Sequence, residues 1–435
     1  MSAATAGPRP VISGLGFITS IGNDRTEVVA SLRALRHGLA PFEYLPGCDL
    51  PVKVAGTVKG FDTRSDHFSE WRWPERYHFT RERLRSLPPH GLHACCAVEQ
   101  MIADARLTPE LLAAADTGLF TASAGSPFLQ RRYLNLMYES QGERLAPLGV
   151  ISTISGTLNF NLGAHYHIRG AVCGFNSACA SAAHAIGYAC DEVRLGRLQR
   201  VLIVGAEDLT ADSVYSFHGL RALSRNPDPD TASRPFDAAR DGFVGTGGAV
   251  ALLVENEASA LARGAPIYAE VRGWGQSADG YNVAISDPEG AGLARAMETA
   301  IRAAGVTPGE VDYVNAHATS TPAGDRSEAL ALRTVFGAAG ARPAISSTKA
   351  LTGHGLSMAS VMETGFCALA LSEGFIPGQA HLVTPAPECE GLHLPRSTES
   401  RAPRIVLKNS SGFGGSNVVL VLARHERSSD AARCA

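Results

Sequence analysis

The sequence lacks several features that mark other classes of protein. No apolar run approaches the ~18 residues that cross a membrane, and the first residues lack the hydrophobic segment of a secretory signal. The formal net charge is −3 on 435 residues, which excludes the strongly basic face that bulk nucleic-acid binding requires. Nine cysteines form no C-x-x-C pair and no zinc-like Cys/His spacing. We therefore expect a cytoplasmic protein with no membrane insertion, no nucleic-acid partner and no metal site.

The composition that is present is that of a folded chain. Apolar residues make up 45% and charged residues 19%, which allows a sizeable core and excludes global disorder. The sequence also contains a faint internal repeat. Glycine-rich turns lead into apolar strands at 245–254 and 412–421, and each turn follows a helical segment of small residues, at 182–195 and 355–372.

The repeat predicts two similar α/β halves. We place them at residues 9–257 and 264–424, followed by a flexible tail at 425–435. The aromatic and basic stretch 60–90 is interpreted as a solvated surface loop or helix. Glycine turns before strands are common, so the repeat alone is weak evidence.

Cys179 is the first candidate for chemistry. It stands in Asn176-Ser-Ala-Cys-Ala-Ser, at the start of a helix of small residues. The unpaired N–H groups and partial positive charge of a helix N-terminus favour the thiolate, which is the reactive form. The other eight cysteines have no such setting and are interpreted as small buried hydrophobic residues, the commonest role of a free cysteine.

Two histidines lie at the ends of predicted elements. His317 follows the apolar segment 311–316, and His354 follows a strand-like segment that leads through glycine into a helix. Such ends are where α/β proteins place their sites. Either histidine alone is more often structural, but one cysteine with two histidines suits thioester chemistry, because neutral imidazoles can polarise a carbonyl. The turn 412–415 either aims a backbone N–H at an oxyanion or simply precedes the last strand.

Four motifs together resemble the β-ketoacyl-acyl-carrier-protein synthases, most closely the elongating type II branch with its Cys-His-His triad. They are Asn176-Ser-Ala-Cys-Ala-Ser, Asn315-Ala-His-Ala-Thr-Ser-Thr-Pro-Ala-Gly-Asp325, Ser347-Thr-Lys-Ala-Leu-Thr-Gly-His354 and Asn409-Ser-Ser-Gly-Phe-Gly-Gly-Ser-Asn417. The similarity covers residues 9–424 in order. It implies a dimer and the thiolase fold, in which duplicated α/β halves form a five-layered αβαβα architecture.

The resemblance implies a role for each matching residue. Cys179 would carry the acyl chain as a thioester, and His317 and His354 would bind the malonyl thioester carbonyl and assist decarboxylation. The carbanion would then attack the acyl thioester in a Claisen condensation. Lys349 and Glu363 would organise the two histidines, although an ordinary partly buried ion pair is the alternative.

The resemblance also implies how substrate is held. Backbone N–H groups of the nucleophile and of Phe413 would form the oxyanion hole, in a turn that includes Gly412 and Gly414. The Phe413 ring would gate the acyl pocket. Thr319 and Thr321 would bind the phosphopantetheine arm. No cofactor of the enzyme's own is implied, because 4′-phosphopantetheine arrives on the acyl carrier protein.

Acyl carrier protein is the partner that the resemblance implies. Arg81, Arg83 and Arg85 fall near the family's docking face for this acidic protein, although a solvated charge run is an equally good interpretation. The dimer would be a homodimer or a heterodimer with a homologue that resembles a chain-length factor.

The sequence departs from the family pattern at several places. His317-Ala replaces the usual His-Gly, Gly355 to Ser360 replace Leu-Leu-Gly-Ala-Ala-Gly, 245–248 lacks the usual Gly-Ala-Gly ending, and 122–128 lacks the usual glycine-rich pattern. No triad residue is lost. The departures favour a specialised synthase, for example of a polyene or polyketide pathway, over a housekeeping fatty-acid enzyme.

Several alternatives share the fold. A degradative thiolase would need a second cysteine in a Cys-x-Gly context, which neither Cys389 nor Cys434 provides. The initiating branch has an asparagine where His354 stands, and a chain-length factor lacks the nucleophile. A catalytic subunit that is active only in a heterodimer, and a non-catalytic homologue, both stay open.

Overall fold

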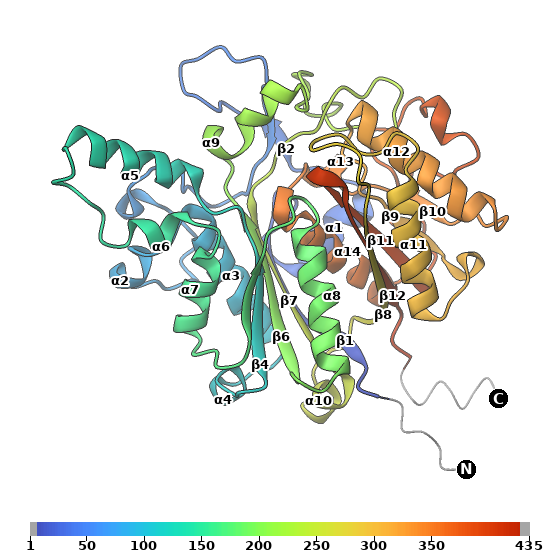
Figure 1. The fold of residues 1–435 in the computed structure, drawn as a ribbon, viewed down its shortest axis with the longest axis horizontal. Coiled ribbons are helices and arrows are strands. Elements are labelled where there is room, and N and C mark those ends of the chain that lie inside the picture. Colours follow the sequence, from blue (N-terminus) through green and yellow to red (C-terminus); the bar gives the residue numbers. More distant parts are fainter. Residues whose placement is uncertain (1–6, 427–435) are drawn as a thin grey trace.

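A computed structural model describes residues 7–426 and contains one mixed sheet of ten strands in the order β10-β9-β11-β12-β8-β1-β7-β6-β4-β5 (Figure 1). A separate two-stranded sheet pairs β2 with β3. The strands are β1 (Pro10–Ile18), β2 (Leu39–Pro41), β3 (Val54–Gly56), β4 (Thr117–Ala122), β5 (Val172–Phe175), β6 (Arg200–Glu207), β7 (Gly248–Asn256), β8 (Ala269–Ala278), β9 (Tyr313–Asn315), β10 (Ala344–Ser346), β11 (Ile405–Gly412) and β12 (Ser416–Ala423).

The α-helices surround and separate these strands. They are α1 (Arg25–Ala34), α2 (Arg81–Leu84), α3 (Pro89–Asp104), α4 (Pro109–Leu112), α5 (Pro127–Glu139), α6 (Gly149–Thr153), α7 (Thr157–His165), α8 (Ser181–Arg194), α9 (Ala211–Val214), α10 (Glu257–Ala262), α11 (Ala291–Ala304), α12 (Pro322–Leu332), α13 (Lys349–Thr352) and α14 (Ala359–Glu373). None of the helices in the described part of the chain is long and apolar enough to span a membrane.

The two halves of the large sheet have one topology. In the first half β4 is parallel to β5 and β6, while β7 is antiparallel to β6 and β1. In the second half β9 is parallel to β10 and β11, while β12 is antiparallel to β11 and β8. Each half therefore repeats the same five-strand order, which confirms the predicted duplication. The halves join where β1 pairs with β8, Val11 opposite Glu270. Their strands lie within 10–256 and 269–423, and the exact domain boundaries stay a prediction.

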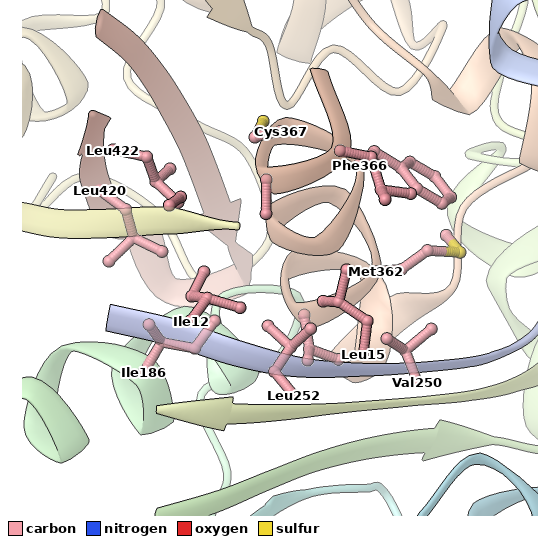
Figure 2. Close-up of a cluster of buried hydrophobic side chains, with 14 of the residues drawn as sticks. Ile12, Leu15, Ile186, Val250, Leu252, Met362, Phe366, Cys367, Leu420 and Leu422 are labelled. Carbon is pink, nitrogen blue, oxygen red and sulfur yellow. The ribbon is translucent and has the colours of Figure 1, made fainter. Parts of the chain in front are cut away.

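Five layers follow from this arrangement (Figure 1). α8 and α14 lie between the two half-sheets, α3 covers the outer face of the first half, and α11 and α12 cover that of the second. In Figure 2, Met362 of α14 lies over Leu15 of β1 and Val250 of β7. α14 is buried from Ala359 to Leu371 and mostly apolar, as suits a central helix, and its buried polar residues include Ser360 and Glu363. The predicted αβαβα architecture is confirmed.

The stretch 60–90 differs from its predicted solvated state. Trp71 and Tyr77 are buried and pack with α3 and the first half-sheet, so the interpretation as a solvated loop is wrong for these side chains. Their aromatic area covers apolar surface that no regular element reaches. Of the predicted tail, residues 427–435 lie outside the described residues. His425 contacts Glu257, with 2.7 Å between Nε2 and Oε1.

Candidate active site

The structure brings the three predicted catalytic residues together where the two halves meet. Cys179 precedes α8 of the first half, His317 follows β9, and His354 follows α13. The Cys179 Sγ lies 3.0 Å from the His354 Nε2. The rings of His317 and His354 stand edge to face, with centroids 5.4 Å apart. The sequence separates these residues widely, but the sheet places their element ends at one site.

A tight turn holds the nucleophile. Ala178 has φ = 46°, a left-handed conformation that costs a non-glycine residue about 1–3 kcal/mol. Ser181 stabilises the turn, because its hydroxyl accepts from the Ser177 N–H at 2.8 Å and donates to the Ala178 carbonyl at 2.6 Å. Gly412 presses against the same turn. A Cβ added there would lie 2.8 Å from the Ser177 oxygen and 3.2 Å from the Cys179 nitrogen, so only glycine fits.

The thiol differs from its predicted state. Burial raises the pKa of Cys179 to about 12, although the nearby Lys349 acts in the opposite direction. The α8 helix begins at Ser181, two residues after the cysteine, so Cys179 lies before the helix and not within its first turn. The expectation of a free thiolate is therefore wrong. Cys179 is a neutral thiol that shares a hydrogen bond with His354 and needs that imidazole to take its proton.

Both histidines are neutral bases. Burial lowers the pKa of His317 and of His354 well below the usual value, and the ammonium groups of Lys349 and Lys408 lower both further. The two Nδ1 atoms are buried without a hydrogen-bond partner among the residues that the structure describes. A neutral imidazole can accept the thiol proton or donate an N–H to a carbonyl oxygen.

Buried charges support the two histidines. Lys349 and Glu363 form the predicted ion pair, and both side chains are buried. The structure also places residues here that sequence reasoning missed. Glu328 accepts the backbone N–H of His317 at 2.9 Å, which fixes the start of that loop. Lys408 lies 2.7 Å from the second oxygen of Glu363. A lysine inside the apolar strand 405–408 was the available signal for the latter.

The predicted substrate-binding residues lie in the turn 412–415 and at the start of α12. Phe413 is 41% exposed, and its ring lies 5.7 Å from the ring of Phe217. Thr319 and Thr321 share a 3.1 Å hydroxyl contact at the start of α12. Gly414 has φ = 78°, which returns the chain into β12. Among loop and turn hydrogen bonds of residues 7–426, neither the Cys179 nor the Phe413 N–H donates one, so both are free to bind an oxyanion.

The three predicted docking arginines do not form one surface. Arg81 and Arg85 are exposed on either side of α2. Arg83 instead turns inward: its guanidinium lies 4.9 Å from the Phe79 ring and 3.7 Å from the Glu99 carboxylate. The assignment of Arg83 to a docking face is therefore wrong, because packing and pairing already use its side chain.

The departures from the family pattern place hydroxyl groups into the buried polar network. Ser357 donates to Glu207, Ser360 donates to the Cys179 carbonyl at 3.1 Å, and Ser123 contacts the His90 Nε2 at 3.1 Å. Hydroxyl groups of the segments 122–128 and 355–360 thus contact buried polar groups beneath them.

Comparison with known proteins agrees with this geometry. The N-terminal domain of the β-ketoacyl synthases matches residues 9–260, and their C-terminal domain matches residues 268–383. The chain is 37% identical to 3-oxoacyl-[acyl-carrier-protein] synthase 1 of Escherichia coli over 421 residues, which covers 96% of this chain and 99% of the relative.

Solved structures show the same likeness. The ishigamide ketosynthase/chain length factor superimposes with a TM-score of 0.86 at 30% identity, covering 97% of this chain and 100% of that one. A type II PKS ketosynthase, bound to the hexaketide and in complex with its acyl-carrier protein, superimposes with a TM-score of 0.84 at 25% identity over the same shares. With its duplicated fold and its Cys-His-His site, the chain belongs to the β-ketoacyl synthase family of carbon–carbon bond-forming acyltransferases.

Proposed function

We propose that the enzyme joins an acyl group carried on Cys179 to malonyl-acyl carrier protein by decarboxylative Claisen condensation. The observation that carries the proposal is the 3.0 Å contact between the Cys179 Sγ and the neutral His354 Nε2, with a second neutral imidazole beside it. A thiol with a pKa of about 12 needs such a base within hydrogen-bond reach.

The first half-reaction loads the acyl chain. His354 takes the Cys179 proton as the sulfur attacks the thioester carbonyl of the acyl carrier protein. The carrier thiolate leaves and receives that proton, which returns His354 to its neutral state. The N–H groups of Cys179 and Phe413 hold the tetrahedral oxyanion.

The second half-reaction forms the carbon–carbon bond. His317 and His354 donate N–H bonds to the malonyl thioester carbonyl, which stabilises the enolate as carbon dioxide leaves. The enolate carbon attacks the acyl thioester, the carbon–sulfur bond to Cys179 breaks, and the departing thiolate takes up one proton from solvent water. Thr319 and Thr321 hold the phosphopantetheine arm. Each step uses side chains of this protein and groups carried on substrate, so we propose no cofactor of its own.

We further propose that the substrate belongs to a specialised polyketide or polyene pathway. The altered segments 122–128 and 355–360 support this proposal, because they replace the usual small residues by hydroxyls bound to buried charges. The chain resembles both the 3-oxoacyl-[acyl-carrier-protein] synthase 1 of Escherichia coli and the ishigamide ketosynthase. The described cysteines are unpaired, which suits the reducing cytoplasm.

A dimer through the open edge of β5 is part of the proposal. In the described residues β5 pairs with β4 alone, which leaves one row of its backbone groups unpaired. α7 and α8 flank this edge. Large apolar side chains are exposed around it: Val150, Ile151, Ile154, Phe160, Val172 and Tyr188. A second copy of this chain, or a homologous chain with the same edge, would cover them.

Intact mass spectrometry tests the function. Wild type, Cys179→Ala and the matched control Cys173→Ala, an exposed cysteine in β5, are incubated with a panel of acyl carrier proteins. We expect an acyl adduct on wild type and Cys173→Ala alone, then a carrier product two carbons longer once malonyl carrier protein is added. An adduct on Cys179→Ala would contradict the mechanism.

The same samples distinguish the alternatives. Native mass spectrometry reports one copy or two, and Val172→Glu should dissociate a dimer built on β5. If no donor acylates a homodimeric wild type, the chain is a subunit that is active only with a homologous partner, or a non-catalytic homologue.

A further inference from the structure

Two of the four lysines in the chain meet at one buried carboxylate. Glu363 contacts Lys349 through Oε1, and its Oε2 lies 2.7 Å from the Lys408 Nζ. The exposed fraction of each side chain is 1% or less. One carboxylate cannot neutralise two ammonium groups, so the cluster carries an excess positive charge when both lysines are protonated. Burial lowers the pKa of Lys408, and the Glu363 carboxylate acts in the opposite direction.

Lys408 is also linked to the nucleophile. Its Nζ donates to the Asn409 carbonyl and to the Ser410 hydroxyl, both at 2.6 Å. The Ser410 hydroxyl lies 2.8 Å from that of Ser360, which donates to the Cys179 carbonyl at 3.1 Å. An unbroken hydrogen-bonded chain therefore runs from this ammonium group to the peptide that carries the reactive thiol.

We propose that Lys408 is a positioning residue of the active site, which holds the peptide of Cys179 through Ser410 and Ser360 and supplies a second buried positive charge beside His317 and His354. The proposal rests on the catalytic roles given above to the cysteine and the two histidines. Lys349 alone satisfies the Glu363 ion pair, so Lys408 is not needed to neutralise that carboxylate.

The charge of Lys408 acts on the histidines. Its ammonium group lowers the pKa of His317 and of His354, in the same direction as burial and Lys349. A protonated imidazole could not accept the Cys179 proton, so an excess cation keeps the base available at lower pH. The titratable groups around Lys408 come from several elements: Glu363 and Cys367 of α14, Lys349 of α13, Glu328 of α12, and the two histidines.

The test is the pH profile of Lys408→Met. Methionine has a side chain of similar length to lysine. The substitution also leaves Glu363 paired with Lys349, so no buried charge is left without a partner. Condensation activity of the full-length enzyme is measured from about pH 5 to 9. We expect kcat to fall about tenfold. The acid limb of the pH profile, where activity is lost as pH falls, should move upward by about half a pH unit or more. The limb moves up because the histidines gain protons more readily without the cation. KM should stay unchanged.

Two further variants separate charge from position. Ser360→Ala keeps both lysines but cuts the hydrogen-bonded chain, so kcat should fall while the acid limb stays in place. Arg200→Met is the matched control: it removes a buried cation at the far end of β6 that pairs with the half-exposed Asp116. Arg200 begins β6 and Glu207 ends it, so the two residues lie seven residues, about 23 Å, apart along the strand. This control should lower thermal stability without moving the limb.

The outcomes are decisive. An unmoved limb in Lys408→Met, or the same shift in Arg200→Met, overturns the role of the charge. An unchanged kcat in Ser360→Ala overturns the role of the hydrogen-bonded chain, and this variant serves alone if Lys408→Met does not fold. Acylation of wild-type Cys179 is recorded first, so a failure of the proposed function is recognised separately.

Discussion

The protein buries two pairs of histidines, and their neighbours give the pairs different properties. His317 and His354 lie beside ammonium groups, and both are neutral. His90 lies beside Asp208, with 2.9 Å between Nδ1 and Oδ1, and the carboxylate raises the pKa of His90 against the effect of burial. His93, one turn further along α3, has no hydrogen-bond partner in the described part of the chain. Burial lowers the pKa of His93, His317 and His354, and only at His90 does an adjacent carboxylate outweigh it.

The two pairs also differ in what they can do. The first pair contacts the nucleophile and leaves basic nitrogen available, which is the state that proton transfer requires. His90 and Asp208 form a closed ion pair, and Ser126 donates to that carboxylate at 2.6 Å. We expect His90 and His93 to support the structure and not the reaction. The predictions below test this division between the two pairs of histidines, in descending order of effect.

Replacing His354 by alanine should remove most of the condensation activity. The Cys179 thiol would lose the base that takes its proton, and the malonyl carbonyl would lose an N–H donor. We expect a loss of about 10³-fold in kcat, the scale of general acid–base catalysis. Steady-state rates of wild type, His354→Ala and the control His93→Phe measure it. Activity of His354→Ala within about tenfold of wild type would contradict the division.

Replacing Asp208 by asparagine should chiefly affect stability. It removes the carboxylate that pairs with the buried His90 imidazole, which should cost about 3 kcal/mol in the free energy of unfolding. Urea unfolding measures this cost. The control Asp116→Asn removes a half-exposed partner of Arg200 and should cost less than about 1 kcal/mol.

The pH dependence of the Asp208→Asn effect follows from the pKa directions. His90 has a raised pKa in the folded protein, so its contribution is full below about pH 6.5 and declines as pH rises through the folded pKa. Asp208 has a lowered pKa, so its contribution is full above about pH 3.9 and declines as pH falls through the folded pKa. The stability difference should therefore be greatest between roughly pH 4 and 6.5. A stability difference that does not change with pH would show that His90 and Asp208 are not paired.

His93→Phe should reduce acid sensitivity. Burial lowers the pKa of His93 to about 4, against about 6.5 in the unfolded chain, so the unfolded chain binds more protons between these values. Stability is therefore lost as pH falls through this range. Urea unfolding at about pH 7.5 and about pH 5 should show a loss about 2 kcal/mol smaller in the variant. The introduced phenyl ring would retain the aromatic contact with Phe61. Equal losses in both proteins would contradict this account.

Ser123→Ala should have the smallest effect. The hydroxyl contacts the His90 Nε2 at 3.1 Å, and its loss leaves one buried ring nitrogen without a partner. The expected cost is about 1 kcal/mol in the free energy of unfolding. Condensation activity on the preferred acyl chain should keep the wild-type acid limb. A moved limb would show that the second pair of histidines is coupled to the first.

Local sequence predicted some features of the site and not others. The glycine turn 412–415 was recognised in the sequence, whereas the close approach of Gly412 to the Cys179 turn is seen only in the structure. The position of Cys179 near a helix start can be read from the sequence, and it favoured a thiolate. The desolvation of the thiol, which raises its pKa, cannot be read from the sequence. Arg83 was expected on a docking face, but its side chain packs on Phe79 and pairs with Glu99 of the neighbouring helix α3.

Local sequence was enough to predict the duplicated α/β halves and the small-residue helices, and to single out the cysteine and the two histidines that the structure brings together, because periodicity and element ends are local properties. The protonation of those side chains depended on the tertiary structure instead. Lys349, Lys408 and Glu363 belong to three separate elements, and their charges act on the histidines through space. Electrostatic energy depends on distance and burial, which no linear spacing records.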